Sequence, residues 1–245
     1  MQRCKTGIQG LDVILGGGIP EGSTVLLSGM AGAGKSIFSM NFLINGAKVF
    51  GEKCLYLSTE QTEEELQKVA SQFGWNLVEL ENKNLLRIVY FKVLGEDHFL
   101  QRIDELVQTF KPKRIVIDSL TTLIDSLIMS EMQKDEAFSM IRVADSVSPI
   151  PRTEQIITKI MLYHLFDQLK NYDATTVLTS EIHEASAVSS DGVSEFVVDG
   201  VIVLTSVEGD DGFRTLRVPK MRLTKQKRGI YNFEITDSGI VVNIE

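Results

Sequence analysis

A glycine-rich stretch near the N-terminus constrains what this chain can fold into more than any other part of the sequence. An apolar run at 24–28 precedes it, and apolar residues with helical spacing follow it between 38 and 47. A strand, a glycine-rich loop and then a helix form the setting in which the pattern G-x-x-x-x-G-K-[ST] binds phosphate. The stretch, called the phosphate loop below, consists of Gly29, Met30, Ala31, Gly32, Ala33, Gly34, Lys35 and Ser36.

Each residue type in the phosphate loop has its own role in the predicted site. The glycines let the backbone curl so that successive N–H groups face phosphate oxygens. The N-terminus of the following helix adds a positive partial charge. Lys35 can reach the β- and γ-phosphates, and the Ser36 hydroxyl can ligate Mg²⁺. Together with Ile37, the phosphate loop is the predicted nucleotide-binding site; the alternative is a glycine-rich turn that matches the pattern by chance.

Length and composition indicate an ordinary globular protein. The chain has 245 residues, of which 43% are hydrophobic and 24% charged, and this suits one α/β domain over 1–245. No run of about 18 apolar residues occurs, and no apolar segment follows Met1–Lys5, so we expect neither a membrane partner nor a secretory signal. Cys4 and Cys54 lack the spacing of a metal site. A cytoplasmic location is therefore predicted.

The charges are unevenly distributed along the chain. The net charge is −8, but residues 213–231 carry only basic charges, so the rest of the chain is more acidic than the total suggests. A basic segment on an acidic protein requires an anionic counterpart, which could be phosphate, nucleic acid or the acidic flank of an identical neighbour. This basic band consists of Arg214, Arg217, Lys220, Arg222, Lys225, Lys227 and Arg228.

Strands and helices are predicted to alternate through most of the chain. We expect a loop-rich lead-in over 1–23 and then a mainly parallel sheet flanked by helices, extended by antiparallel strands over 200–245. Parallel strands are predicted at 24–28, 53–58, 86–91, 114–118 and 174–180, and antiparallel ones at 201–206, 215–223, 231–235 and 240–244, with a turn at 208–212. Helices are predicted from the phosphate loop to 49 and over 62–73, 97–110, 120–129, 133–146 and 153–170, with a proline-containing break at 148–151.

Acidic residues follow three of the predicted parallel strands, whose carboxyl ends meet at one edge of the sheet. Asp118 ends a strand and could hold Mg²⁺, or it could cap the next helix. Glu60 could take a proton from the attacking water or orient it, or be a solvated loop acid. Ser180-Glu181 could sense the γ-phosphate or simply be solvated. The sequence thus predicts that these groups lie together with the phosphate loop.

Several further stretches resemble the KaiC-like branch of the RecA-type P-loop ATPases, and the resemblance covers essentially the whole chain. The residues that carry it are Thr6-Gly7-Ile8, Gly10-Leu11-Asp12, Gly16-Gly17-Gly18-Ile19-Pro20, the phosphate loop, Thr59-Glu60, Ile117-Asp118-Ser119, Thr179-Ser180-Glu181, Asp199-Gly200-Val201, Lys220-Met221-Arg222 and Tyr231 to Ile240. The chain is similar to a single-domain member of this family. The implied fold is a RecA-like α/β fold.

The resemblance implies a homo-oligomer, a hexameric ring with ATP and Mg²⁺ at each subunit interface. Lys220 and Arg222 would reach the neighbour's ATP and stabilise charge on the transferring phosphoryl group. Glu60 would serve the attacking water, and Asp237 would lie near the nucleotide from the adjacent subunit. The alternative for Lys220 and Arg222 is an exposed basic strand face.

The sequence also departs from the family pattern in three places. Glu60 is followed by Gln61 where the family often has a second glutamate, which predicts slow turnover. Leu223 stands where glycine is common, so the local turn is expected to differ. Glu195-Phe196 replaces the pair of hydroxyl residues that the clock protein phosphorylates, and only one ATPase domain is present. Autokinase activity is therefore not expected.

Three functions remain open from the sequence. The first is an ATP-hydrolysing ring or switch that signals through a protein partner. The second is a recombinase-like, DNA-dependent ATPase, although residues 181–199 hold five acidic residues and no Lys or Arg, which disfavours a DNA-facing loop there. The third is a scaffold that binds ATP and scarcely hydrolyses it.

Overall fold

The computed structural model describes residues 2–92, 99–125, 151–182, 188–206 and 213–244. Its main element is a nine-stranded sheet with the strand order β11-β10-β9-β8-β3-β7-β6-β4-β5. The strands are β3 (Thr24–Gly29), β4 (Cys54–Ser58), β5 (Leu86–Tyr90), β6 (Arg114–Asp118), β7 (Thr175–Glu181), β8 (Gly200–Ser206), β9 (Arg214–Met221), β10 (Ile230–Thr236) and β11 (Gly239–Val242). A separate two-stranded sheet joins β1 (Arg3–Cys4) to β2 (Ile19–Pro20).

The large sheet has a parallel and an antiparallel part. Strands β8, β3, β7, β6, β4 and β5 are parallel neighbours, and β9, β10 and β11 continue the sheet in antiparallel pairs. The predicted mainly parallel sheet with an antiparallel C-terminal extension is confirmed. Because the parallel strands share one direction, their carboxyl ends all lie at the same edge of the sheet.

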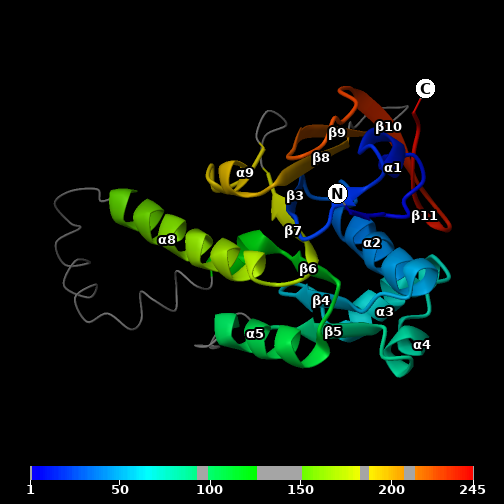
Figure 1. Cartoon of the computed structure of the whole chain (residues 1–245), viewed down its shortest axis with the longest axis horizontal. Coiled ribbons are helices and arrows are strands. Elements are labelled where there is room, and N and C mark those ends of the chain that lie inside the picture. Colours follow the sequence, from blue (N-terminus) through cyan, green and yellow to red (C-terminus); the bar gives the residue numbers. More distant parts are fainter. Residues whose placement is uncertain (1, 93–98, 126–150, 183–187, 207–212, 245) are drawn as a thin grey trace.

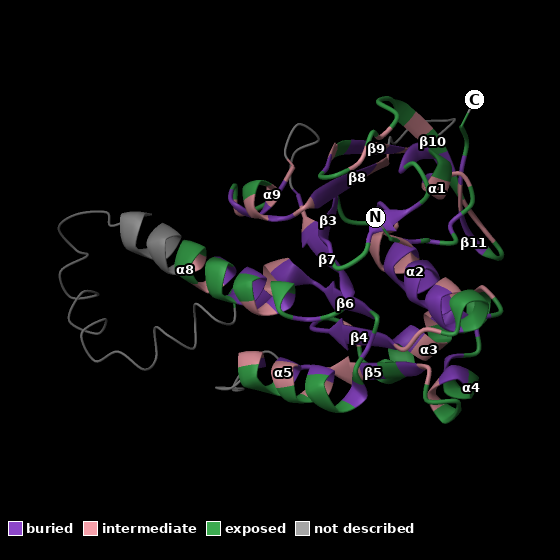
Figure 2. Cartoon of the chain, in the orientation of Figure 1, coloured by how far each residue is buried: buried purple, intermediate pink, exposed green. Residues whose placement is uncertain are grey.

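Helices cover both faces of the parallel strands (Figure 1). One core lies beneath α2 (Lys35–Phe50), α3 (Glu63–Gln72) and α4 (Leu77–Asn82), and the other beneath α5 (Phe99–Phe110) and α8 (Pro151–Lys170). Neighbouring residues on β3 alternate between the two: Val25 and Leu27 belong to the first core, and Leu26 belongs to the second. Figure 2 shows the strands buried between helices whose outer sides are exposed. No helix in the described ranges is long and apolar enough to cross a membrane.

Local sequence signals explain several helix boundaries. A capping box, S/T-x-x-E in the sequence, starts α3: the Thr62 hydroxyl accepts a hydrogen bond from the backbone N–H of Glu65, and the Glu65 carboxylate accepts one from the backbone N–H of Thr62. Helix α2 ends where Gly51 adopts a left-handed conformation with φ 66°, which glycine adopts without steric penalty.

The structure differs from the sequence prediction in its shortest elements. The lead-in, expected to lack regular structure, holds β1, β2 and the helix α1 (Leu11–Ile14), and two further helices, α4 and α9 (Ser194–Val197), were not predicted. Helices of four to six residues are too short to show a helical period. Residues 120–125 are helical as expected. The helix predicted over 133–146, the turn at 208–212 and residues 148–150 of the predicted break lie outside the described residues, and Pro151, the last residue of that break, begins α8.

A fully buried arginine ties the lead-in to the large sheet. The Arg114 guanidinium donates hydrogen bonds to a Glu52 carboxylate oxygen (2.5 Å), to the carbonyl oxygen of Phe42 on α2 (2.9 Å) and to that of Lys5 (2.8 Å). Its charge is therefore paired, and each of its three nitrogens donates a hydrogen bond, as suits a buried guanidinium. Arg114 thereby holds the lead-in against the helix that follows the phosphate loop.

Candidate nucleotide-binding site

The phosphate loop connects β3 to α2 in the conformation that the glycine pattern predicts. Gly32 and Gly34 have φ values of 74° and 98°, a region that side chains with a Cβ rarely adopt. Gly34 is the N-cap of α2 and provides no side-chain hydrogen bond to the helix. The first backbone N–H groups of the helix lack intrahelical partners, and such a terminus binds phosphate.

Lys35 is the first residue of α2, and its side chain reaches back to the start of the phosphate loop. Its ammonium group donates hydrogen bonds to the carbonyl oxygens of Gly29 (2.8 Å) and Met30 (3.0 Å). Burial lowers the pKa of Lys35, whereas the nearby carboxylates of Glu181, Asp118 and Glu60 act to raise it. The ammonium group therefore lies among the acidic residues that were predicted to follow the strands.

These groups line a cavity of about 400 Å³ at the carboxyl edge of the sheet. Its volume is within the range of small-molecule sites. Glu60, Asp118 and Glu181 meet the phosphate loop there, as predicted. Gln61, Val69 and Ser119 also line the cavity, although none of them was predicted to bind the nucleotide or the metal. The lining residues are Ala31, Gly32, Gly34, Lys35, Ser36, Ile37, Glu60, Gln61, Val69, Asp118, Ser119 and Glu181.

Asp118 is buried and held by two hydroxyl groups. Its Oδ2 accepts a hydrogen bond from the Tyr56 hydroxyl and its Oδ1 accepts one from the Thr179 hydroxyl, both at 2.5 Å. Burial raises the pKa of Tyr56 well above its usual value, and the nearby Asp118 carboxylate raises it further, so the phenol remains a donor. The Ser36 hydroxyl and the Asp118 carboxylate provide the hard oxygen ligands that Mg²⁺ prefers. The residues present therefore fit Mg²⁺.

Glu60 is oriented by residues that follow β6. Its Oε1 accepts hydrogen bonds from the hydroxyl groups of Ser119 (2.5 Å) and Thr122 (2.8 Å). The Thr59 hydroxyl accepts a hydrogen bond from the backbone N–H of Ser119 (2.9 Å). The Asp118–Ser119 peptide bond is cis. The ends of β4 and β6 therefore position Glu60 beside Asp118 and Lys35.

Ser180 and Glu181 end β7, but their side chains have different neighbours. Glu181 lines the cavity, and its backbone N–H donates a hydrogen bond to the Thr121 hydroxyl (3.1 Å). The Ser180 hydroxyl is 3.3 Å from the hydroxyl of Ser190. Of this predicted pair, Glu181 is the one that reaches the phosphate loop.

Lys220 binds carbonyl groups of its own chain. Its ammonium group donates hydrogen bonds to the carbonyl oxygens of Glu195 (2.9 Å), Phe196 (3.2 Å) and Val198 (2.6 Å). Burial lowers its pKa most, and the nearby Arg222 guanidinium lowers it further. Lys220 thus holds the segment that contains α9.

Arg222 also contacts this segment. Its Nη1 lies 3.1 Å from a carboxylate oxygen of Asp199, and its Nη2 donates a hydrogen bond to the carbonyl oxygen of Phe196 (3.3 Å). The Arg222 side chain is 48% exposed. Because solvent screens an exposed ion pair, little free energy is needed to release Arg222 toward another partner.

The strand register places Lys220 and Arg222 at the opposite edge of the sheet from the phosphate loop. Asp199, the partner of Arg222, exchanges hydrogen bonds with the backbone of Thr24 at the start of β3, whereas the loop begins at the other end of β3, at Gly29. At about 3.3 Å per residue, β3 separates the two groups by about 16 Å. Of the residues described as lining the cavity, none belongs to the basic band.

Asp237 lies in the turn between β10 and β11, beside the chain's own α2. The backbone N–H of Ile240 donates a hydrogen bond to the Asn41 side chain on α2 (2.9 Å). Ile235 packs against Gly34: a Cβ added at Gly34 would lie 3.2 Å from the Cδ1 atom of Ile235. The turn therefore packs on the start of the helix that follows the phosphate loop. Contact of Asp237 with a nucleotide of the adjacent subunit stays a prediction.

Sequence reasoning did not identify four residues that hold the predicted ones. Tyr56 and Thr179 bind Asp118, and Ser119 and Thr122 bind Glu60. The available signal for Tyr56 was a phenol between two leucines in a strand predicted to be buried, because a buried hydroxyl requires a hydrogen-bond partner.

Comparisons with known proteins identify the family of this chain. A family model described as "ATPase: KaiC" matches residues 4–143 and 131–245. The chain belongs to the KaiC family of ATPases. Circadian clock oscillator protein KaiC of Synechococcus elongatus is 34% identical over 250 residues, which cover 97% of this chain and 43% of that protein. KaiC of Parathermosynechococcus lividus is 33% identical over 248 residues, covering 96% and 41%. The chain thus spans less than half the length of these relatives.

A solved structure matches over its full length. The KaiC-like protein PH0186 from Pyrococcus horikoshii OT3 superposes with a TM-score of 0.79 at 33% identity, covering 99% of each chain. The RecA-type P-loop fold predicted from the resemblance is confirmed. Membership of this ATPase family supports nucleotide binding and ATPase activity.

Proposed function

We propose that this chain binds Mg²⁺–ATP in the cavity at the carboxyl edge of the sheet and hydrolyses the ATP slowly. We further propose that this occurs at the subunit interfaces of a ring, expected to be a hexamer, in which residues 1–245 form one ATPase domain. The observation that carries the proposal is that the two edges of the sheet hold different functional groups. Its carboxyl edge holds the phosphate loop and the acidic residues, while the opposite edge carries Lys220 and Arg222.

Within one chain, each residue at the carboxyl edge has a defined task. The backbone N–H groups of the phosphate loop and of the start of α2 bind the phosphates, and Lys35 turns from the carbonyl groups of Gly29 and Met30 to the γ-phosphate. Ser36 and Asp118 would hold Mg²⁺, which supplies positive charge to the β- and γ-phosphate oxygens when bound. Glu60, held by two hydroxyl groups, orients the attacking water and takes its proton.

A second copy is needed to complete the site. Lys220 and Arg222 lie about 16 Å from the phosphate loop of their own chain, as estimated from the length of β3. Head-to-tail contacts place one edge of a subunit against the opposite edge of the next, and they close into a ring when the rotation allows. In such a ring the cations of one chain face the phosphates of its neighbour and stabilise the charge of the transition state.

The proposed role is regulatory, and the chain would act through a protein partner that remains to be identified. The two curated relatives described above are named as circadian clock oscillator proteins, which supports a signalling role rather than a metabolic one. Slow turnover is proposed because Glu60 is followed by Gln61, so one carboxylate serves the water. Autokinase activity is not proposed, because Glu195 and Phe196 lack hydroxyl groups. A cytoplasmic location stays a prediction.

Steady-state ATP turnover at physiological salt, with and without single-stranded DNA, tests the proposed function. We expect slow, Mg²⁺-dependent turnover that DNA does not change and that is lost in Lys35→Ala. A many-fold stimulation by DNA would instead favour the recombinase-like function and make the basic band a strand-binding surface. Nucleotide binding without turnover would favour the scaffold. Full ADP affinity in Lys35→Ala, measured by calorimetry, would contradict the site itself.

A further inference from the structure

The hydroxyl group of Tyr56 contacts Asp118, one of the two residues expected to hold Mg²⁺. It donates a hydrogen bond to Asp118 Oδ2 (2.5 Å). Tyr56 is 1% exposed and does not line the nucleotide cavity. We propose that Tyr56 is a positioning residue that orients the Asp118 carboxylate for Mg²⁺. This inference rests on the proposed binding of Mg²⁺–nucleotide.

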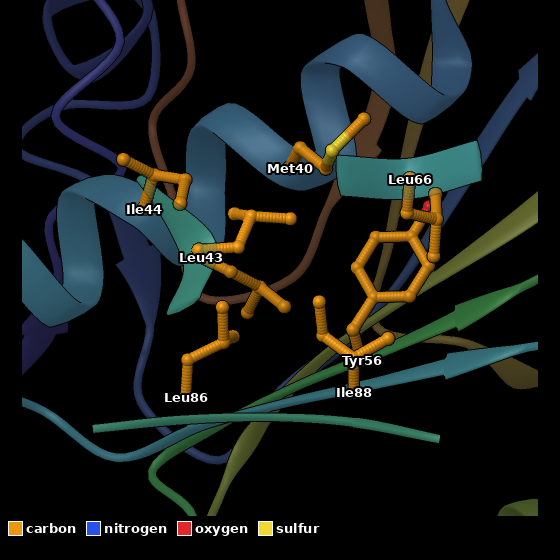
Figure 3. A pocket seen from close by; sticks show the side chains of 8 residues that line it. Met40, Leu43, Ile44, Tyr56, Leu66, Leu86 and Ile88 are labelled. Carbon is orange, nitrogen blue, oxygen red and sulfur yellow. The ribbon is translucent and has the colours of Figure 1, made fainter. Parts of the chain in front are cut away.

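The phenol ring and the hydroxyl of Tyr56 have different surroundings. Figure 3 shows the ring standing on β4 beneath α2, with the side chains of Met40 and Leu66 nearby. Together with other aliphatic residues they enclose a small apolar void of about 10 Å³. The packing of the ring therefore needs only an aromatic side chain. The hydroxyl is buried at the end of an apolar ring, where a polar group is costly without a partner, and its partner is Asp118.

The hydrogen bonds to Asp118 leave room for a metal or for its water molecules. An ionised carboxylate offers about four lone-pair sites. Tyr56 uses one on Oδ2, and Thr179 uses one on Oδ1. Two donors on different oxygens prevent rotation of the carboxylate about its terminal bond. The remaining lone pairs are therefore held in one direction. Hydrogen-bond partners of metal ligands act in this way, and their loss commonly lowers metal affinity 10- to 100-fold.

Replacement of Tyr56 by phenylalanine separates these two roles. Tyr56→Phe keeps the ring among the aliphatic side chains and removes the donor to Asp118. Tyr172→Phe is a matched control, because Tyr172 is also buried and its hydroxyl accepts a hydrogen bond from the Gln168 side chain (2.6 Å) in the other core. Both variants lose one buried phenolic hydroxyl group, but only one loses a contact with a metal ligand.

The experiment measures ADP binding by titration calorimetry in EDTA and at increasing Mg²⁺ concentrations. Each variant's ADP affinity in EDTA serves as its own reference, and the measured quantity is the Mg²⁺ concentration that gives half of the affinity gain. We expect this concentration to rise about 10-fold in Tyr56→Phe and to stay at the wild-type value in Tyr172→Phe. Thermal unfolding without ligand reports any general loss of stability.

The outcomes separate this inference from the proposed function. A half-effect concentration of Mg²⁺ within twofold of wild type in Tyr56→Phe would overturn the positioning role while the function stands. A wild-type chain whose ADP affinity does not respond to Mg²⁺ would overturn both. If Tyr56→Phe does not fold, Thr179→Val removes the other donor to Asp118 with little change of shape. It is expected to raise the half-effect concentration as well, and an unchanged value would refute the orientation argument.

Discussion

Chains that carry Arg222→Ala and chains that carry Lys35→Ala should each be inactive alone and regain ATP turnover when mixed. The first variant keeps an intact phosphate loop, and the second keeps an intact cation at the opposite edge of the sheet. If Arg222 acts on the neighbour's nucleotide, a mixed interface joins the two intact halves. If it acted on the nucleotide of its own chain, mixing would restore nothing.

The structure sets the size of the effect that Arg222 could have within its own chain. Two unit charges about 16 Å apart interact by about 0.3 kcal/mol in water, which changes a rate less than twofold. That separation is also about twice the screening length of about 8 Å at physiological ionic strength. A cation that contacts the transferring phosphoryl group from a neighbouring chain contributes about 10³–10⁵-fold. A loss of about 100-fold or more in Arg222→Ala therefore requires action across an interface.

The assay measures phosphate release from the two variants mixed in equal amounts. Half of the chains then have an intact phosphate loop, and half of their neighbours provide Arg222, so about one quarter of the interfaces are complete in a head-to-tail ring. We expect turnover at about that fraction of wild type. The control mixes Arg222→Ala with the double variant Lys35→Ala/Arg222→Ala, which offers no cation. Co-elution of differently labelled chains shows that the two variants assemble together. If they co-elute and turnover still does not recover, action across the interface is refuted.

Two other substitutions test the remaining contacts. Glu60→Gln should keep ADP affinity and slow turnover by about 100-fold or more, because the water loses its base; an unchanged rate in a phosphate-release assay would assign the base to another group. Arg114→Ala should lower the free energy of unfolding by about 3–5 kcal/mol, since Glu52 and two backbone carbonyl groups lose a buried partner. In the same urea titration, Lys83→Ala, which breaks an exposed pair with Glu79, should leave the free energy of unfolding nearly unchanged; similar losses in both variants would contradict the argument.

Features that depend on neighbouring residues could be predicted from the sequence. The phosphate loop is one continuous stretch, and the capping box pairs residues three positions apart. Asp118, Glu60 and Glu181 come from distant stretches, yet all follow parallel strands. The direction of the strands alone therefore brings them to one edge of the sheet.

Contacts that depend on the packing of distant side chains could not be predicted in this way. The hydrogen bond from Tyr56 to Asp118 joins residues 62 positions apart, and it requires β4 and β6 to be neighbours in their observed register. Likewise, Arg3 donates hydrogen bonds to the carbonyl oxygen of Leu223 (3.0 Å) and to the Thr224 hydroxyl (2.6 Å). Leu223 has a φ of 58°, which explains why glycine suits this position and which the sequence indicated only as a departure from the family.

The position of the cations follows from the direction of the strands as well. Strand β9 runs antiparallel to β8, so its end, which carries Lys220, lies beside the start of β8 and far from the carboxyl edge. A chain whose cations followed a parallel strand would bring them to its own phosphate loop. Here the reversal of one strand gives the two edges of a single sheet different chemistry, with the phosphate loop and the acidic residues at one edge and Lys220 and Arg222 at the other. Under the proposed function, such a subunit completes its site against another copy, so we expect turnover to depend on assembly.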